Sequence, residues 1–470
     1  MGERTVRTGP ALAVVSAAVF MASLDLFIVN IAFPDIARDF GATSLANLSW
    51  VLNGYTIVFA SLLVPLGRTA DRFGRRRFFI GGLLLFVAAS AAAAAAPSIE
   101  ALVAARVVQA VGAAALMPTS LALLLAEIPL AKRATAIGIW AATGGIAAAA
   151  GPPLGGLLVE ASWRWVFLIN VPIGLAAAFA ATRVLRESSD PAHARRPDVL
   201  GAALLTVAVG LLALGLVKAP DWGWVDVRTI AALAGSALAL ASFVYRSAHH
   251  PSPIVELPMI RVRSFSMAST TAFLFSAGFG AMLLGGVLFL TSIWDYSVLE
   301  AGIAFAPGPF SAAVFALPAG RLGPRVGTHV LATLGCLLFA AGAAWWALRA
   351  GSDPAYFTEL LPGMLLTGMG VGLTLPSVSA AAVSELPPAR LATGSAVLQM
   401  SRQLGIALGV AILIAIFGHP SPQDALAHFH AGWWFMAAVA LMGAVAASRI
   451  PVPQTQNQVT PALAQSAGSP

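Results

Sequence analysis

The chain has 470 residues, of which 59% are hydrophobic and only 10% are charged, and its mean hydropathy is +0.85. A soluble protein of this length has about a quarter of its residues charged, so the composition excludes a soluble enzyme or binding domain and predicts a protein that lies in lipid. The net charge of +7 raises the alternative of a nucleic-acid partner. The positions of the basic residues along the chain decide between this alternative and a membrane protein.

Apolar stretches, separated by charged residues or by clusters of proline and glycine, divide the chain into fourteen segments about as long as a membrane-spanning helix. The predicted helices lie near residues 11–33, 47–66, 77–96, 99–125, 133–158, 164–185, 198–217, 228–246, 265–291, 299–319, 327–348, 357–383, 391–417 and 430–448. The polar residues 451–470 predict a disordered tail.

The basic residues lie mainly in alternate loops. Twenty of the 27 lysines and arginines fall in loops on the side of the N-terminus, five in the opposite loops, and Arg106 and Arg402 inside predicted helices. Because cytoplasmic loops are enriched in basic residues, this distribution predicts a multi-pass protein of the cell (inner) membrane with both termini in the cytoplasm. It also removes the reason to expect nucleic acid as a partner.

Asp25 is the only carboxylate deep inside a predicted helix, about 12 Å from the outer end of the first one. Arg106 and Gln109 lie about 10–15 Å from the outer end of the fourth. An unpaired ionisable group is costly in a membrane, so we expect Arg106 to approach Asp25 within ion-pair or one-water distance. A carboxylate that loses its proton beside an arginine and regains it on separation is a proton-coupling device; a structural ion pair is the alternative.

Residues 67–77 form a predicted tight turn with many positive charges around one carboxylate, Asp71. Glu127 ends the fourth predicted helix on the same side, where Arg75 could reach it. As a basic loop alone, this segment would only set topology.

The fifth predicted helix is rich in small residues and proline, with Gly138, Gly151, Pro152, Gly155 and Gly156. Small residues four apart allow two helices to approach backbone to backbone, and proline bends a helix. Ordinary tight packing is one interpretation of this pattern.

Arg402 lies near the middle of the helix predicted over 391–417 and has no carboxylate in its own helix. We expect it to bond to backbone carbonyls or polar side chains, with a role in substrate binding as the alternative. His428 and His430 lie two residues apart on an outer loop, which is too weak a pattern for a metal site, and no metal is predicted. Cys336 is the only cysteine, so no intramolecular disulfide exists.

The chain repeats itself. The segment 65–74 recurs at 318–327, and 112–118 recurs at 370–376, which indicates two homologous halves. The repeat distance exceeds six helices by about 50–60 residues, room for one extra helical hairpin. We therefore predict an N-terminal six-helix bundle, an additional hairpin and a C-terminal six-helix bundle, over 11–187, 197–247 and 263–450.

The spacing of glycine, aspartate and arginine in 67–77 resembles the loop signature of the major facilitator superfamily. Four further segments resemble helix signatures of its fourteen-helix drug:proton antiporter branch: 24–34, 50–55, 163–172 and 394–405. The resemblance covers about residues 20–450. It implies an all-α polytopic membrane fold, with two pseudo-symmetric six-helix bundles and two extra central helices.

The resemblance also implies roles for particular residues. The fourth-helix motif of the superfamily, whose arginine is implicated in proton coupling, matches Arg106 and Gln109, with Ala110 in place of its usual glycine. The pattern from Gly138 to Gly156 resembles the antiporter motif, with Ala147 where the family has a glycine, and it favours export. A latch between the inner ends of the two halves would comprise Gly67, Asp71, Arg72, Gly74, Arg75 and Glu127.

A substrate cavity between the halves would be lined mainly by polar and aromatic residues, with one methionine. The candidates are Phe27, Asn30, Trp50, Asn53, Tyr55, Gln109, Met117, Gln399 and Arg402. Asp25 beside aromatic rings would suit a cation, although the only deep carboxylate is also needed for the proton.

These observations predict a monomeric secondary transporter rather than an enzyme. It would export small lipophilic or cationic compounds such as drugs and antibiotics in exchange for protons, by alternating access. Its partners would be that substrate, protons and the lipid bilayer, and a proton gradient would replace any cofactor. A symporter or facilitator for a small metabolite is the alternative. An ATP-driven pump is excluded within the chain, since neither of its lysines, Lys132 and Lys218, lies in a phosphate-binding loop.

Overall fold

A computed structural model describes residues 8–41, 44–128, 133–189, 198–387, 390–418 and 423–451. The N-terminal half consists of α1 (Thr8–Asp39), α2 (Leu45–Leu48), α3 (Trp50–Phe73), α4 (Arg75–Ala94), α5 (Ile99–Glu127), α6 (Arg133–Ala161), α7 (Trp165–Leu168) and α8 (Asn170–Val184). The two following helices are α9 (Val199–Trp222) and α10 (Val227–His249). The C-terminal half consists of α11 (Leu257–Ile260), α12 (Arg263–Ser292), α13 (Val298–Phe305), α14 (Pro307–Val326), α15 (Thr328–Arg349), the π-helix η2 (Tyr356–Leu360), α16 (Leu361–Val383), α17 (Leu391–Phe417) and α18 (Ala425–Ser448).

Thirteen helical segments are long and apolar enough to cross a membrane. A further helix, α6, has 29 residues and a shorter apolar part, Ile146–Ala161. With α6 counted, the described residues contain the fourteen predicted helices in the predicted order, and the all-α fold class is confirmed. The tail predicted over 451–470 lies outside the described residues from position 452 onward.

The turn predicted over 67–77 is much shorter in the structure. Helix α3 continues through Phe73, and α4 begins at Arg75, so Gly74 alone separates them. Gly74 has φ +120°, which side-chain-bearing residues rarely adopt. Gly327 separates α14 from α15 in the same way, with φ +97°, so the repeated sequence motif produces a repeated sharp corner.

The main helix contacts of the two halves correspond. In the N-terminal half α4 packs on α5, α3 on α5, α1 on α6, α4 on α8 and α1 on α8. In the C-terminal half the matching pairs are α15 with α16, α14 with α16, α12 with α17, α15 with α18 and α12 with α18. Across the interface α3 packs on α17, α6 on α13 and α1 on α12.

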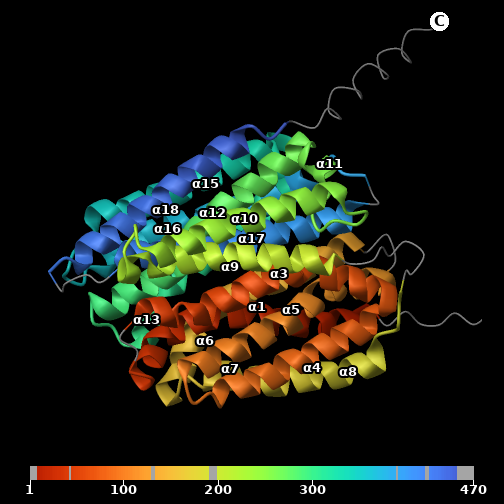
Figure 1. Cartoon of the computed structure of the whole chain (residues 1–470), viewed down its shortest axis with the longest axis horizontal. Coiled ribbons are helices and arrows are strands. Elements are labelled where there is room, and N and C mark those ends of the chain that lie inside the picture. The colour runs from red at the N-terminus through yellow and green to blue at the C-terminus, as the bar shows by residue number, and fades with distance from the viewer. Residues whose placement is uncertain are drawn as a thin grey trace, which may run out of the picture.

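The helices α9 and α10 form a hairpin that packs against both halves through α9. Helix α9 contacts α3 of the N-terminal half and α17 of the C-terminal half, while α10 packs mainly on α9 (Figure 1). Large apolar side chains on α10, such as Val227, Leu238 and Tyr245, are exposed, as expected for a helix that faces lipid.

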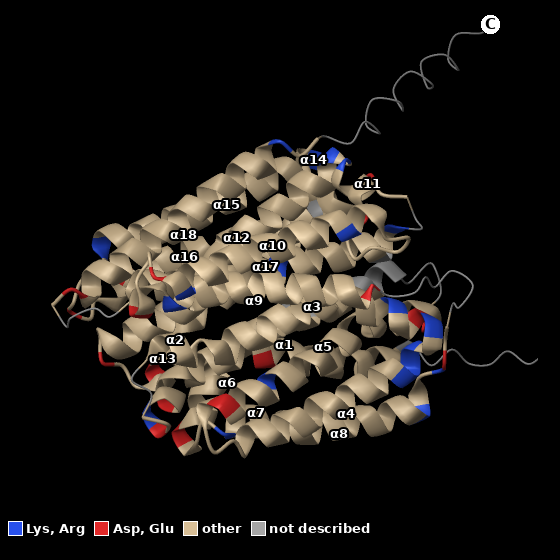
Figure 2. Cartoon of the chain, viewed as in Figure 1, with Lys and Arg blue, Asp and Glu red and all other residues tan. Residues whose placement is uncertain are grey.

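Charged side chains gather at the two ends of the helical bundle, and few lie in the apolar middle (Figure 2). One end carries Arg68, Arg72, Arg75, Arg76 and Arg77, at the corner between α3 and α4. This end is called the arginine-rich end below, and the other is called the opposite end.

Candidate functional site

Asp25 on α1 and Arg106 on α5 form a buried ion pair, as their matching depths predicted. The relative exposure of Asp25 is 0% and that of Arg106 is 1%. Arg106 Nη1 donates to Asp25 Oδ2 and also to Gln109 Oε1 at 2.6 Å, while its Nε donates to the Val51 carbonyl oxygen at 3.2 Å. The pair is held by three helices, since Val51 belongs to α3.

Two further side chains complete this polar site. Asp25 Oδ1 accepts from Gln109 Nε2 at 2.9 Å and from Asn170 Nδ2 at 3.1 Å. Ser90 Oγ of α4 accepts from the same two amide groups, at 2.8 and 3.4 Å. Asp25, Ser90, Arg106, Gln109 and Asn170 are called the Asp25 cluster below; they join α1, α4, α5 and α8.

Aromatic rings cover the guanidinium group of Arg106. Its Cζ lies 4.1 Å from the centroid of the Tyr55 ring and 5.7 Å from that of Phe167. A cation over an aromatic face is stabilised most where water is absent. The rings therefore stabilise the guanidinium group of Arg106 in its buried position.

Three N–H donors, from Arg106, Gln109 and Asn170, point at the Asp25 carboxylate. Two of these residues lie on α5 and the third lies on α8. Moving α1 away from α5 and α8 would therefore break all three hydrogen bonds to the carboxylate.

Sequence reasoning missed Ser90 and did not assign Asn170 to this site. Ser90 lies in an alanine-rich helix, where a serine is an ordinary small residue and nothing in the sequence marks its partner. Asn170 lay in a segment that resembles a family signature, and an amide inside a membrane-spanning helix is itself a signal for a polar contact.

The nine residues predicted to line a substrate cavity lie in several different parts of the structure. Gln109 and Tyr55 belong to the Asp25 cluster or its aromatic cover. Phe27 lies at the interface between the halves, with its ring 6.3 Å from that of Phe279 on α12. Asn30 Nδ2 donates to the carbonyl of Leu26 in its own helix, at 2.9 Å.

The remaining candidates lie on three helices. Asn53 on α3 is fully buried, and among the described residues neither of its amide atoms has a hydrogen-bond partner. Trp50 on α3 and Met117 on α5 are half-buried. Gln399 and Arg402 face each other on α17, where Arg402 Nη1 donates to Gln399 Oε1 at 3.2 Å.

The predicted latch residues make contacts inside the N-terminal half. Arg75 Nε pairs with Asp71 Oδ1 at 2.7 Å, and Glu127 Oε1 accepts from the backbone N–H of Arg186 at 3.2 Å. The guanidinium of Arg72 lies over the ring of Phe73, 5.4 Å from its centroid. Arg75 thus pairs with Asp71, where the sequence suggested that it could reach Glu127.

Glycines allow close packing around this corner. A Cβ on Gly67 would lie 3.2 Å from Pro118 of α5, and one on Gly74 would lie 2.9 Å from the carboxyl group of Glu187. That carboxyl group accepts from the backbone N–H groups of Arg76 and Arg77, at 3.0 and 3.3 Å. Glu187, which sequence reasoning did not identify, therefore caps the first turn of α4.

The segment after the α9–α10 hairpin contacts both halves at the arginine-rich end. Arg68 Nη1 donates to Ser252 Oγ at 2.9 Å and to the carbonyls of Ser252 and Pro253 at 3.0 and 2.8 Å. Glu256 lies 3.6 Å from Arg68 Nη2 and 3.3 Å from Arg390 Nε. Since Arg68 belongs to α3 and Arg390 directly precedes α17, Glu256 links the two halves.

The small residues of α6 pack on both halves. A Cβ on Gly151 would lie 2.7 Å from Phe27 Cβ of α1, and one on Gly155 would lie 3.0 Å from Ile28. On the other side of α6, a Cβ on Gly156 would lie 2.9 Å from the Cα of Leu299 in α13. Pro152 lies in the same turn, and Gly138 also lies on α6. The motif therefore joins α6 to α1 and to α13, near the opposite end.

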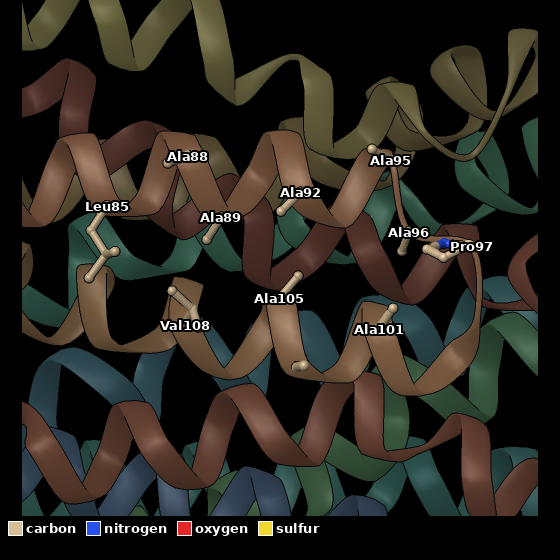
Figure 3. Close-up of a pocket in the computed structure, with 11 residues that line it drawn as sticks. Leu85, Ala88, Ala89, Ala92, Ala95, Ala96, Pro97, Ala101, Ala105 and Val108 are labelled. Atoms are coloured by element: carbon tan, nitrogen blue, oxygen red, sulfur yellow. The ribbon is translucent and has the colours of Figure 1, made fainter.

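An apolar groove of about 520 Å³ lies between α4 and α5 (Figure 3). Alanines form most of its lining, which includes Ala89, Ala105 and Val108. Within the described residues, no group of three metal-ligating side chains occurs.

Comparison with known proteins agrees with this architecture. The family model of the Major Facilitator Superfamily matches residues 15–195 and 268–467, and the unmatched stretch between them contains α9 and α10. In the solved structures, the POT family transporter PepTSo has a TM-score of 0.68 at 15% identity, over 93% of this chain and 97% of its own.

Curated relatives are more similar in sequence. The multidrug resistance protein Stp of Mycobacterium tuberculosis is 35% identical over 84% of this chain and 73% of its own length. The cephamycin export protein CmcT of Amycolatopsis lactamdurans is 34% identical over 99% of this chain and 95% of its own. On the family match, the repeated helix packing and this similarity, the chain belongs to the major facilitator superfamily and is a multi-pass membrane transporter, not an enzyme.

Proposed function

We propose that this transporter exports small lipophilic compounds, drugs or antibiotics among them, in exchange for protons. The protein would span the cell membrane with its arginine-rich end in the cytoplasm, in accord with the positive-inside rule. The proton gradient would be its energy source without any cofactor. A monomer suffices for this mechanism, because the Asp25 cluster and the α6–α13 contact both form within one chain.

The observation that carries the proposal is the buried Asp25–Arg106 pair. Within the part of the chain that the structure describes, Asp25 is the only carboxylate deep inside a membrane-spanning helix, so a proton that crosses this region by a carboxylate must use it. The pair is fully buried, and its charges cancel, so the resting site can remain in a medium of low dielectric constant.

Helix α1 connects this pair with the interface between the halves. It packs on α5 and α8, which hold the partners of Asp25, and also on α12 of the C-terminal half. Phe27, two residues after Asp25, contacts Phe279 of α12. A rocking of one half against the other would therefore move α1 relative to α5 and loosen the hold on Asp25.

In the exchange cycle, the outer end opens, Asp25 takes a proton from outside, and the substrate leaves. After the halves rock back, Arg106 and the amide donors return to Asp25, and the proton is released to the cytoplasm. The resistance and export functions named for the relatives support the direction of transport, as does the glycine-rich packing of α6 on α1 and α13.

Everted membrane vesicles energised with a pH gradient test the proposal. The compounds tested are lipophilic dyes, quaternary ammonium compounds and antibiotics. We expect some of them to accumulate inside the vesicles and to leave the vesicles when a protonophore collapses the pH gradient. Asp25→Asn should abolish this accumulation while the protein still inserts and still exchanges labelled for unlabelled substrate. Asp226→Asn, which changes a half-buried carboxylate at the opposite end, is the matched control. Undiminished accumulation by Asp25→Asn would refute the coupling role.

A further inference from the structure

Arg402 is a charged side chain in the middle of α17. It lies about 15–25 Å from both ends of this helix and is half-buried. Its Nη1 donates to Gln399 Oε1 at 3.2 Å. Its Nε is buried and, among the described residues, has no hydrogen-bond partner. The next side chain, Gln403, is 2% exposed, and its Oε1 also lacks a described partner.

The C-terminal half offers Arg402 no opposite charge at this depth. Helices α12, α14, α15, α16, α17 and α18 contain no aspartate or glutamate. The carboxylates nearest to Arg402 in sequence are Glu385 and Asp424, which lie beyond the two ends of α17. In the N-terminal half, Arg106 already neutralises Asp25. Among the described residues, the middle of the helical bundle therefore has one positive charge in excess.

A half-buried guanidinium with a buried Nε, whose only described bond is to a neutral amide, is poorly compensated. Ionisable groups inside a membrane are costly unless they are paired or hydrated, and an unmade hydrogen bond on a buried donor adds to that cost. A purely structural arginine would be expected to bond carboxylates or several backbone carbonyls. Arg402 instead keeps a donor unmatched on the α17 face that also carries Gln399.

We propose that Arg402 binds an anionic group of the transported compound, a carboxylate or an ionised phenol or enol. The planar guanidinium suits two parallel hydrogen bonds to a carboxylate, and Gln399 and Gln403 supply neutral polar groups on either side along the helix. Helix α17 packs on α3 and α12 at the interface between the halves. This inference rests on the proposed export function and specifies its substrate class.

The charge balance argues against the cationic substrate that the sequence suggested. That expectation depended on Asp25, which is neutralised by Arg106 and fully buried. A cation that entered the interior would meet the repulsion of Arg402 without a free carboxylate to offset it. An anion would be attracted, and the attraction is stronger in a medium of low dielectric constant.

Matched sets of ligands test the substrate class with the purified full-length protein. One set is 2-naphthoate, methyl 2-naphthoate and (2-naphthylmethyl)trimethylammonium, and equivalent sets on two larger aromatic scaffolds cover ligand size. Binding is measured from the ligand-dependent rise in Tm. We expect the acids to bind at least about tenfold more tightly than their esters and ammonium analogues. Arg402→Gln should remove that preference, and Arg402→Lys should retain part of it.

Arg164→Gln is the control, because Arg164 is an exposed arginine whose partner, Asp39, lies at the opposite end. Gel filtration and the Tm without ligand show whether each variant is folded. No preference for acids on any scaffold, or the same preference in Arg402→Gln as in the wild type, overturns the inference.

Transport in everted vesicles distinguishes a failure of the anion-binding inference from a failure of the proposed export function. If proton-driven accumulation of the ammonium probes depends on Asp25 and is unchanged in Arg402→Gln, the export function stands and the anion inference fails. If no compound of any charge accumulates against its gradient, the proposed function itself fails. Accumulation of the acids that is lost in Arg402→Gln, with ester transport kept, supports both.

Discussion

Gly302 of α13 packs directly on the backbone of Pro152 in α6, so closely that a Cβ on Gly302 would lie 2.4 Å from the Pro152 carbonyl oxygen. The two residues belong to different halves of the transporter. This contact closes the interface near the opposite end, and it does so without a charged group or a hydrogen bond between side chains.

We expect Gly302→Ala to weaken this closed contact. The added methyl group cannot fit against the backbone of Pro152, and overpacking of this kind costs about 1–3 kcal/mol. Phe27→Cys in this background should react faster with a membrane-impermeant thiol reagent added outside the cell. Cys336 is buried and does not interfere. Gly210→Ala is the control, since a Cβ on Gly210 meets nothing within 4 Å; equal reactivity in both variants would contradict the prediction.

A double-mutant cycle should show strong coupling between Asp25 and Arg106. Arg106→Gln leaves the carboxylate without its cation, and breaking one partner of a buried ion pair costs about 3–5 kcal/mol. Asp25→Asn with Arg106→Gln removes both charges and should recover much of that stability. Thermal unfolding measures the stability, and proton-driven transport should be lost in all three variants. Additive effects on stability would show that the two side chains do not depend on each other.

Removing the carboxyl group of Glu187 should destabilise the corner between α3 and α4. Its two oxygens accept from the N–H groups of Arg76 and Arg77, and loss of a helix N-cap costs about 0.5–2 kcal/mol. We expect Glu187→Ala to lower the Tm and to speed amide exchange in the first turn of α4. Glu160→Ala, at an exposed position of α6, should change neither quantity; the same loss in both variants would argue against the capping role.

Glu256→Gln should loosen the connection between the halves at the arginine-rich end. The variant keeps the size of the side chain and removes the charge that attracts Arg68 and Arg390. Spin labels placed on the ends of α3 and α17 should give a longer or broader distance distribution. Raising the ionic strength should have the same effect on the wild type, because partly exposed ion pairs are screened. Glu385→Gln is the matched control, and a distance unchanged in Glu256→Gln would defeat the prediction.

The helix order and the Asp25–Arg106 contact could be predicted because they depend on local signals. The length of each apolar stretch defines a membrane-spanning helix. Two charged side chains of opposite sign at the same depth in the membrane are expected to pair, because each is costly there when it is unpaired. Ser90 could not be found in this way, since a serine among alanines shows no sign of its partner until α4 and α5 are packed together.

The contacts of the linker were also beyond the sequence. Glu256 lies in an ordinary polar stretch, and its two arginines are distant in the chain. They come together in the folded chain, where α3 packs on α17. The turn predicted over 67–77 is too long because a run of charged residues is typical of a loop. The backbone of these residues instead remains helical up to Phe73, and Gly74 ends the helix.

The alanine-lined groove between α4 and α5 has a consequence for the Asp25 cluster. Three of its lining residues, Ala89, Ala105 and Val108, directly precede Ser90, Arg106 and Gln109 in the chain, so the groove and the cluster are neighbours on the same turns of α4 and α5. The small side chains that line the groove supply little hydrocarbon of their own. The acyl chains of the bilayer must then supply part of the electrical insulation of the ion pair, and the energetics of proton exchange become a joint property of the protein and the lipid around it.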